Sequence, residues 1–219
     1  MKFKDMEVNL IYGGLSYENG EFIKNNHYSN SIARGCMLNF ELVHNNILIG
    51  LAMVGEPVSN RCQDKYSLFG GKVMELKRLC LIDDTPKNSE SFFLGKIMKI
   101  IQKETDVEVI LSYADPEFDH SGVIYKAANF DIIGREQYPS VKYRLGDRAY
   151  HKRQLYGDSK TSKMLKEALA LGILEKIHCK PKHIYTYRFK RKYGVFSNDK
   201  VDYINHKANK LEDVFIGEL

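Results

Sequence analysis

The chain has 219 residues, of which 43% are hydrophobic, so it is long enough to bury one ordinary core with a small appendage. No apolar run reaches the roughly 18 residues of a membrane helix, and the opening MKFKDMEVNL has no apolar signal-peptide core. The four cysteines lie far apart, without the CxxC spacing of a zinc site. We therefore expect a cytoplasmic protein with reduced thiols and no membrane association.

The formal net charge of +5 is unevenly distributed along the chain. Residues 142–192 contain fifteen Lys and Arg but only four Asp and Glu, which leaves the rest of the chain acidic. A basic segment on an acidic body is typical of a protein with a polyanionic partner. A solvated surface is the equally simple alternative.

The first half of the chain predicts a sheet that begins with a hairpin. In chain order we expect a strand at 7–13, a short helix at 17–28, strands at 37–43 and 46–54, a loop at 55–72 and a strand at 73–82. The gap between the second and third strands holds only His44 and Asn45, and asparagine tolerates the positive φ of a tight turn.

The second half alternates helices and strands. We expect a helix at 89–104 with Ser89 as N-cap, a strand at 107–114, a short helix at 122–129, a strand at 130–136, a polar stretch from 137, a helix near 159–170 and strands at 172–178 and 183–192. The predicted fold is one mixed α/β domain over residues 1–192, with a basic section at 142–192. Residues 193–219 are expected to form a polar tail that could include a short helix.

The stretch HYSNS holds the first candidate chemical groups, His27 and Tyr28. A histidine beside a tyrosine in a polar loop could be a general base or a metal ligand. A lone histidine is more often structural or simply exposed.

A strand-to-helix junction follows at DDTPKNSES, which includes Lys87, Asn88 and Ser89. The N-terminus of a helix presents unpaired backbone N–H groups and a partial positive charge, so it can bind phosphate. The alternative is an ordinary capped turn without a ligand, because nothing in this stretch is glycine-rich.

The stretch LSYADPEFDHSGVIYKAANF places polar groups after a predicted buried strand. Asp115, Asp119 and His120 stand at the carboxyl end of that strand, where α/β sheets collect catalytic groups. They could be acid–base groups or metal ligands, with Glu117 as a further candidate. An acidic turn is the alternative, and Tyr125 could belong to the core.

The basic section also carries tyrosines, and lysine and arginine interleaved with aromatics are typical of nucleic-acid binding. The tyrosines are Tyr150, Tyr156, Tyr185, Tyr187 and Tyr193. Alternatively, the alternate tyrosines of HIYTYRF form one buried face of a strand.

Taken together, these stretches resemble the phage Mom family of DNA adenine-modification proteins, which are similar to GNAT acetyltransferases in fold. The matching pieces are NHYSNSIARGC at 26–36, ELKRLCLIDDTPKNSESFF at 75–93, YADPEFDHSGVIYKAANFDIIGR at 113–135 and PKHIYTYRFKRK at 181–192. The resemblance covers roughly residues 20–192, and it implies a GNAT-like mixed central sheet flanked by helices, with a basic C-terminal extension.

The resemblance implies an enzyme that converts adenine N6 in double-stranded DNA to a carbamoylmethyl adduct, which protects phage DNA from restriction in the host cytoplasm. By motif matching, the catalytic residues are His27, Tyr28, Asp115 and Tyr125. We expect the target adenine to be flipped out of the stack, with Asp115 orienting or deprotonating its N6.

As cofactors we expect an acetyl-CoA-like donor and, because simple acyl transfer does not explain a carbamoylmethyl product, an iron ion. His27, Tyr28 and Asp115 are the candidate iron ligands, because iron accepts mixed nitrogen and oxygen donors. Lys87, Asn88 and Ser89 are the candidate donor-binding residues, although the usual alternating glycines are absent there. An acyltransferase acting on a small amine or a protein and a non-catalytic DNA-binding protein are the alternatives; a homo-oligomer is compatible with all three.

Overall fold

The computed structural model describes residues 1–137 and 140–190. The predicted tail at 193–219 lies outside the described residues. Within them, no helix is long and apolar enough to cross a membrane.

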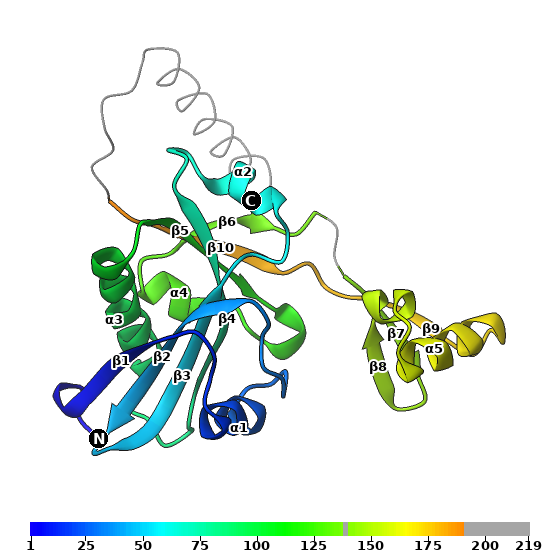
Figure 1. Cartoon of the computed structure of the whole chain (residues 1–219), viewed down its shortest axis with the longest axis horizontal. Helices are drawn as coiled ribbons and strands as arrows, with labels where there is room; N and C mark the ends of the chain where they lie inside the picture. Colours follow the sequence, from blue (N-terminus) through cyan, green and yellow to red (C-terminus); the bar gives the residue numbers. More distant parts are fainter. Residues whose placement is uncertain (138–139, 191–219) are drawn as a thin grey trace, which may run out of the picture. The chain divides into compact units, whose positions relative to one another are not determined.

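The main element of the fold is a seven-stranded mixed sheet with the order β1-β2-β3-β4-β5-β10-β6 (Figure 1). Its strands are β1 (Met6–Tyr12), β2 (Cys36–His44), β3 (Ile47–Gly55), β4 (Lys72–Leu81), β5 (Val107–Ala114), β6 (Asp131–Arg135) and β10 (His183–Arg188). β1 to β4 pair in antiparallel fashion, and β4 pairs with β5 in parallel. This arrangement confirms the predicted mixed sheet and its opening hairpin.

The parallel pairing of β4 with β5 is short. It ends where Glu75 pairs with Leu111, although β4 continues to Leu81 and β5 to Ala114. The last residues of β4 pair with β3 alone. Because parallel strands end at the same edge of a sheet, the loops after β4 and β5 leave from that edge.

Helices flank this sheet, and apolar periodicity explains their packing. The helices are α1 (Tyr17–Asn26), α2 (Arg61–Tyr66), α3 (Ser89–Glu104) and α4 (Val123–Ala127). α3 buries the apolar positions expected from its 3.6-residue period, namely Phe93, Leu94, Ile97, Met98 and Ile101. Ile23 of α1 packs against Leu51 and Met53 of β3, which is buried over most of its length.

The described chain divides into two compact units. Of the described residues, the first contains 1–113, 122–134 and 184–190, and the second contains 114–121, 135–137 and 140–183. The second unit holds a three-stranded antiparallel sheet of order β8-β7-β9, formed by Arg148–His151, Val141–Leu145 and Glu175–His178. The 3-10 helix η3 (Lys152–Tyr156) and helix α5 (Lys160–Ala170) complete it. Whether the chain folds as one domain over 1–192 stays a prediction.

The structure corrects three local expectations. The predicted loop at 55–72 contains α2, and the polar stretch after 137 contains the β7–β8 hairpin. A two-residue turn, Gly146-Asp147, joins these strands. The glycine is a hairpin signal, but the charged residues on either side made the two strands hard to recognise in the sequence. Ser89 is the first residue of α3 and not its N-cap, because Asn88 takes the left-handed conformation that ends the loop. The basic strand β10 belongs to the main sheet. Tyr185 on this strand is only 1% exposed, so the alternative in which the tyrosines of HIYTYRF form a buried strand face is right for that residue.

Candidate functional site

Asp115 follows the last residue of β5 and is fixed by its own turn. Its Oδ1 accepts a hydrogen bond of 3.1 Å from the backbone N–H of Glu117, as the N-cap of a short 3-10 helix. Its carbonyl oxygen accepts from the N–H groups of Phe118 and His120. Only 6% of Asp115 is exposed. The sequence therefore correctly placed Asp115 directly after β5.

Two lysines of the second unit neutralise the carboxylates of this turn. Lys182 Nζ lies 3.4 Å from Asp115 Oδ2, and Lys142 Nζ lies 2.7 Å from Glu117 Oε2. The hydrogen bond from Lys142 lowers the pKa of Glu117, so Glu117 is ionised at neutral pH. From the sequence, both lysines could be assigned only to a basic segment. Their carboxylate partners lie 25 or more positions away in the chain, and no local pattern links residues so far apart.

The other two candidates of this segment are solvent-facing. Asp119 takes a left-handed conformation with φ of 56°, and both Asp119 and His120 are exposed. The His120 ring lies 6.3 Å from that of Phe118. Their positions therefore agree with the alternative that this segment is an ordinary acidic turn.

His27 and Tyr28 follow α1 in the first unit. His27 ends that helix, its N–H donating to the carbonyl of Ile23, and it is 6% exposed. Its ring lies 4.3 Å from the ring of Tyr28, which is 43% exposed. A buried imidazole thus stands behind an accessible phenol, in the loop where the sequence placed both.

Hydrogen bonds from Ser29 determine the tautomer of His27. The Ser29 N–H donates to His27 Nδ1 at 3.1 Å, and the Ser29 hydroxyl lies 2.8 Å from the same nitrogen. A backbone N–H can only donate, so Nδ1 is an acceptor and the proton of the neutral ring lies on Nε2.

This tautomer does not fit a metal ligand. A histidine that binds a metal through Nε2 normally keeps its proton on Nδ1 and donates it to an acceptor. Among residues 1–137 and 140–190, no group of three or more His, Cys, Asp or Glu could hold a metal ion. Nothing here supports iron, and because Asp115 belongs to the second unit, its place in a shared ligand set with His27 stays a prediction.

Tyr125 lies on α4 within an aromatic cluster of the first unit. Its ring centroid is 5.1 Å from that of Tyr185 and 5.5 Å from that of Phe130. Burial raises the pKa of Tyr125 to about 12, with the phenol of Tyr28 adding to the effect and the hydroxyl of Ser112 opposing it. Tyr125 is therefore a neutral hydrogen-bond donor at pH 7. The fully buried Ser112 hydroxyl meets no partner at normal hydrogen-bond geometry in the described structure.

A pocket of about 400 Å³ opens where β4 leads into α3. It is lined by Leu81, Ile82, Asp83, Thr85, Pro86, Lys87, Asn88, Glu90, Ser91, Val123, Ile124 and Ala127. Lys87 and Asn88, two of the three candidate donor-binding residues, thus line this pocket. Ser89 does not line the pocket, because it is fully buried and its hydroxyl donates to the Pro86 carbonyl.

The first turn of α3 fits an anionic group. Asn88 occupies the N-cap position, but its side chain makes no capping hydrogen bond. The N–H groups of Glu90 and Ser91 have no partner within the helix at this position, and both residues line the pocket. The carboxylates of Asp83 and Glu90 also line it, so a bound phosphate would depend on backbone N–H groups and on Lys87.

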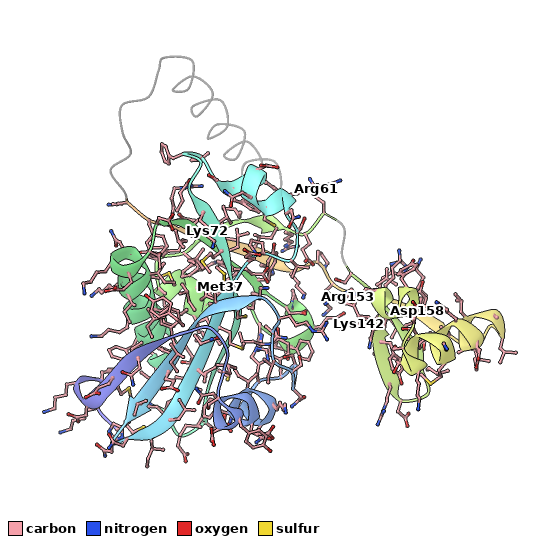
Figure 2. All side chains as sticks on the ribbon, in the orientation of Figure 1. Met37, Arg61, Lys72, Lys142, Arg153 and Asp158 are labelled. Atoms are coloured by element: carbon pink, nitrogen blue, oxygen red, sulfur yellow. The ribbon has the colours of Figure 1, made fainter. Side chains whose placement is uncertain are left out.

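The second unit presents a set of exposed cations that we call the basic face. Its members are Arg148, Lys152, Arg153, Lys160, Lys163 and Lys166, from β8, η3 and α5. Figure 2 labels Arg153 and Lys142 among the side chains of this unit. Tyr156 is 72% exposed beside this set. The face can follow a phosphate backbone with an aromatic ring at hand.

Comparison with known proteins identifies relatives in sequence. Residues 16–205 match the model of the Mom protein family. The methylcarbamoylase mom of Escherichia phage Mu is 32% identical over 132 residues, which are 59% of this chain and 54% of that protein. The chain thus spans about half the length of this curated relative.

Solved structures support the fold. A putative phosphinothricin N-acetyltransferase is 9% identical with a TM-score of 0.50, covering 84% of this chain and 100% of its own. The ribosomal-protein alanine N-acetyltransferase from Escherichia coli is 10% identical with a TM-score of 0.48, covering 87% of this chain and 99% of its own. At 9% identity the likeness to the first of these structures concerns the fold alone, and it supports the predicted GNAT-like fold.

Proposed function

The chain belongs to the Mom protein family, and on that premise we propose that it is an enzyme that modifies adenine N6 in phage DNA. The group added is a carbamoylmethyl group, in keeping with the name methylcarbamoylase of the phage Mu relative. A bulky substituent on N6 blocks the major-groove edge that restriction nucleases read, so the modified DNA is protected.

The observation that carries this proposal is the ordered carboxylate after β5. Asp115 is almost fully buried, and both of its oxygens are held, one by a backbone N–H and the other by Lys182. In the reaction, N6 forms a bond to the methylene carbon of an activated donor while the bond from that carbon to its leaving group breaks. Asp115 orients N6 and accepts the proton that N6 loses.

The tyrosines and the histidine act as hydrogen-bond donors in this proposal. Tyr125 is neutral at pH 7, as is a tyrosine of ordinary pKa, and burial raises its pKa further, to about 12. Nε2 of His27 carries the ring proton. These groups stabilise negative charge that develops on the donor or on its leaving group. No step depends on a metal.

The pocket between β4, α3 and α4 is the proposed site of the donor. The first-turn N–H groups of α3 and the Lys87 ammonium would hold the phosphates of an acyl-CoA-type molecule. An acetyl thioester is activated only at its carbonyl carbon, so the donor would be a related phosphate-bearing molecule whose leaving group is on the methylene carbon itself.

The basic face is the proposed site of the DNA backbone. Its six cations neutralise phosphates, and the target adenine is flipped out so that N6 becomes accessible.

The deciding experiment measures nucleosides. The chain is expressed in a bacterium, total DNA is digested, and nucleoside masses are compared with those from Asp115→Ala and from Asp131→Ala, an exposed carboxylate at the start of β6. We expect a heavier deoxyadenosine with wild type and Asp131→Ala, and none with Asp115→Ala. A folded wild type that yields only unmodified deoxyadenosine would refute the proposal, and acetylation of a small amine without DNA would then favour an ordinary acyltransferase.

A further inference from the structure

Within the second unit, side-chain contacts join the segment that bears Asp115 to the later part of that unit. Glu117 is its main anchor, with Oε2 bonded to Lys142 Nζ at 2.7 Å and Oε1 accepting the N–H of Lys180 at 3.3 Å. The thiol of Cys179 also interacts with the Glu117 carboxylate. One side chain thus joins the Asp115 turn to β7 and to the segment between β9 and β10.

Lys182 is itself held at a fixed place. Its backbone N–H donates to Glu136 Oε2 at 3.2 Å, and its carbonyl accepts the N–H of Glu136 at 2.9 Å. The backbone of Lys182 is therefore fixed, and this places Asp115 within reach of its ammonium. The ammonium forms an ion pair with Asp115 Oδ2, at 3.4 Å.

The shielding of both ion pairs makes them stronger than ordinary surface pairs. The side chains of Lys182 and Asp115 are 31% and 8% exposed, and those of Lys142 and Glu117 are 30% and 23% exposed. Water screens exposed ion pairs, so such pairs do little to fix the orientation of their side chains. Partly buried pairs are screened less, so these two can maintain a geometry.

We propose that Lys182 is a positioning residue for Asp115 and that the Lys142–Glu117 pair anchors the segment on which Asp115 lies. This inference rests on the proposed function, in which Asp115 accepts the proton of N6. With Oδ1 bonded to the Glu117 N–H and Oδ2 directed by Lys182, the carboxylate keeps one orientation. A proton acceptor must be held within a fraction of an ångström for efficient transfer.

The competing role for a lysine in this basic unit is contact with a DNA phosphate. The two roles predict different measurements. A phosphate contact changes DNA affinity and its dependence on salt. A positioning contact changes the rate of modification while DNA affinity stays the same.

The test compares Lys182→Met with Lys182→Arg and with Lys180→Met. Lys180 is an exposed lysine two residues away whose ammonium makes no ion pair with any described residue. The rate at which modified deoxyadenosine accumulates is measured in cells after induction. The affinity of each purified protein for a fluorescent duplex is measured over a range of salt concentrations.

We expect Lys182→Met to lower the rate of modification about 10- to 100-fold with DNA affinity within about twofold of wild type. Lys182→Arg should recover most of the rate, and Lys180→Met should keep it. Lys142→Met, which removes the anchor, should also be slow; it serves as the second variant if Lys182→Met fails to fold by circular dichroism.

Three results would overturn the inference while wild type still modifies DNA. They are a full rate with Lys182→Met, an equal loss of rate and DNA affinity, and no recovery with arginine. An unmodified nucleoside pool with wild type would refute the proposed function itself, and with it the role of Lys182 in that reaction.

Discussion

The backbone N–H of Ser29 donates to Nδ1 of His27 across 3.1 Å, and this bond decides what the imidazole can do. With Nδ1 occupied as an acceptor, the proton of the neutral ring stays on Nε2. His27 then offers a donor, where a metal ligand or a general base would need a lone pair.

This tautomer can be observed directly. Nitrogen-15 NMR of the imidazole should report a proton on Nε2 and a bare Nδ1 in the neutral form of His27. Adding ferrous iron should leave the His27 resonances in place, because neither nitrogen fits a metal as arranged. A neutral ring protonated on Nδ1, or one whose signals move on metal addition, would contradict this arrangement.

The raised pKa of Tyr125 predicts a loss of stability at alkaline pH. A tyrosine ionises near pH 10 when unfolded, while burial holds the folded pKa at about 12. Its stabilising contribution is therefore complete below about pH 10 and is lost as the pH rises to about 12. Denaturant unfolding at pH 9 and pH 11 should show a smaller decrease for Tyr125→Phe than for wild type. Equal decreases would show that the phenol ionises alike in both states.

Removing the charged partner of Glu108 should lower the free energy of unfolding substantially. Its fully buried carboxylate accepts hydrogen bonds from Ser67 and from the backbone of the loop before β4, and it pairs with Arg188. Removing one partner of a buried pair leaves an uncompensated charge. Arg188→Met should lower the free energy of unfolding by about 3–5 kcal/mol.

The matched control is Lys103→Met, because Lys103 pairs with Glu104 at the surface with 83% of its side chain exposed. That variant should change the free energy of unfolding by no more than about 1 kcal/mol. Similar unfolding midpoints for the two variants in urea would argue against a buried pair at Glu108.

Gly122 is a point of close approach between α4 and β10. It has φ of +75°, and a Cβ there would lie 2.3 Å from Cε2 of Tyr185. Gly122→Ala should cost about 1–3 kcal/mol for backbone strain and a similar amount for the clash. Gly70→Ala is the matched control, with φ of +80° and nothing within 4 Å. Thermal unfolding that lowers both midpoints equally would show that the Tyr185 ring moves aside without cost.

The basic face predicts a salt-dependent interaction with DNA. Lys163→Gln on α5 should weaken binding of any duplex sequence, and it should reduce the slope of log K against log salt by about 0.9. Lys99→Gln, an exposed lysine on α3, should leave the slope unchanged. Fluorescence anisotropy at several salt concentrations measures both. An unaltered slope for Lys163→Gln would place the DNA elsewhere on the protein.

Local patterns in the sequence determined most of the first unit. The apolar period of α3 predicted which side chains it buries, and the short gap at His44 and Asn45 predicted the β2–β3 hairpin. Such patterns succeed because each depends on residues within one or two turns of each other. The same locality placed Asp115 at the end of β5, since a strand and its next residue are adjacent in the chain.

The tertiary structure alone decided which distant residues act together. β10 lies between β5 and β6 although some fifty residues of the second unit separate it from β6 in the chain. Lys182 reaches Asp115, and Arg188 reaches Glu108, across sequence distances that no periodicity spans. A single charged residue carries no local signal of its partner, because the pairing depends on where two remote backbones meet. The groups that orient the candidate carboxylate and support β5 therefore became visible only in the folded chain.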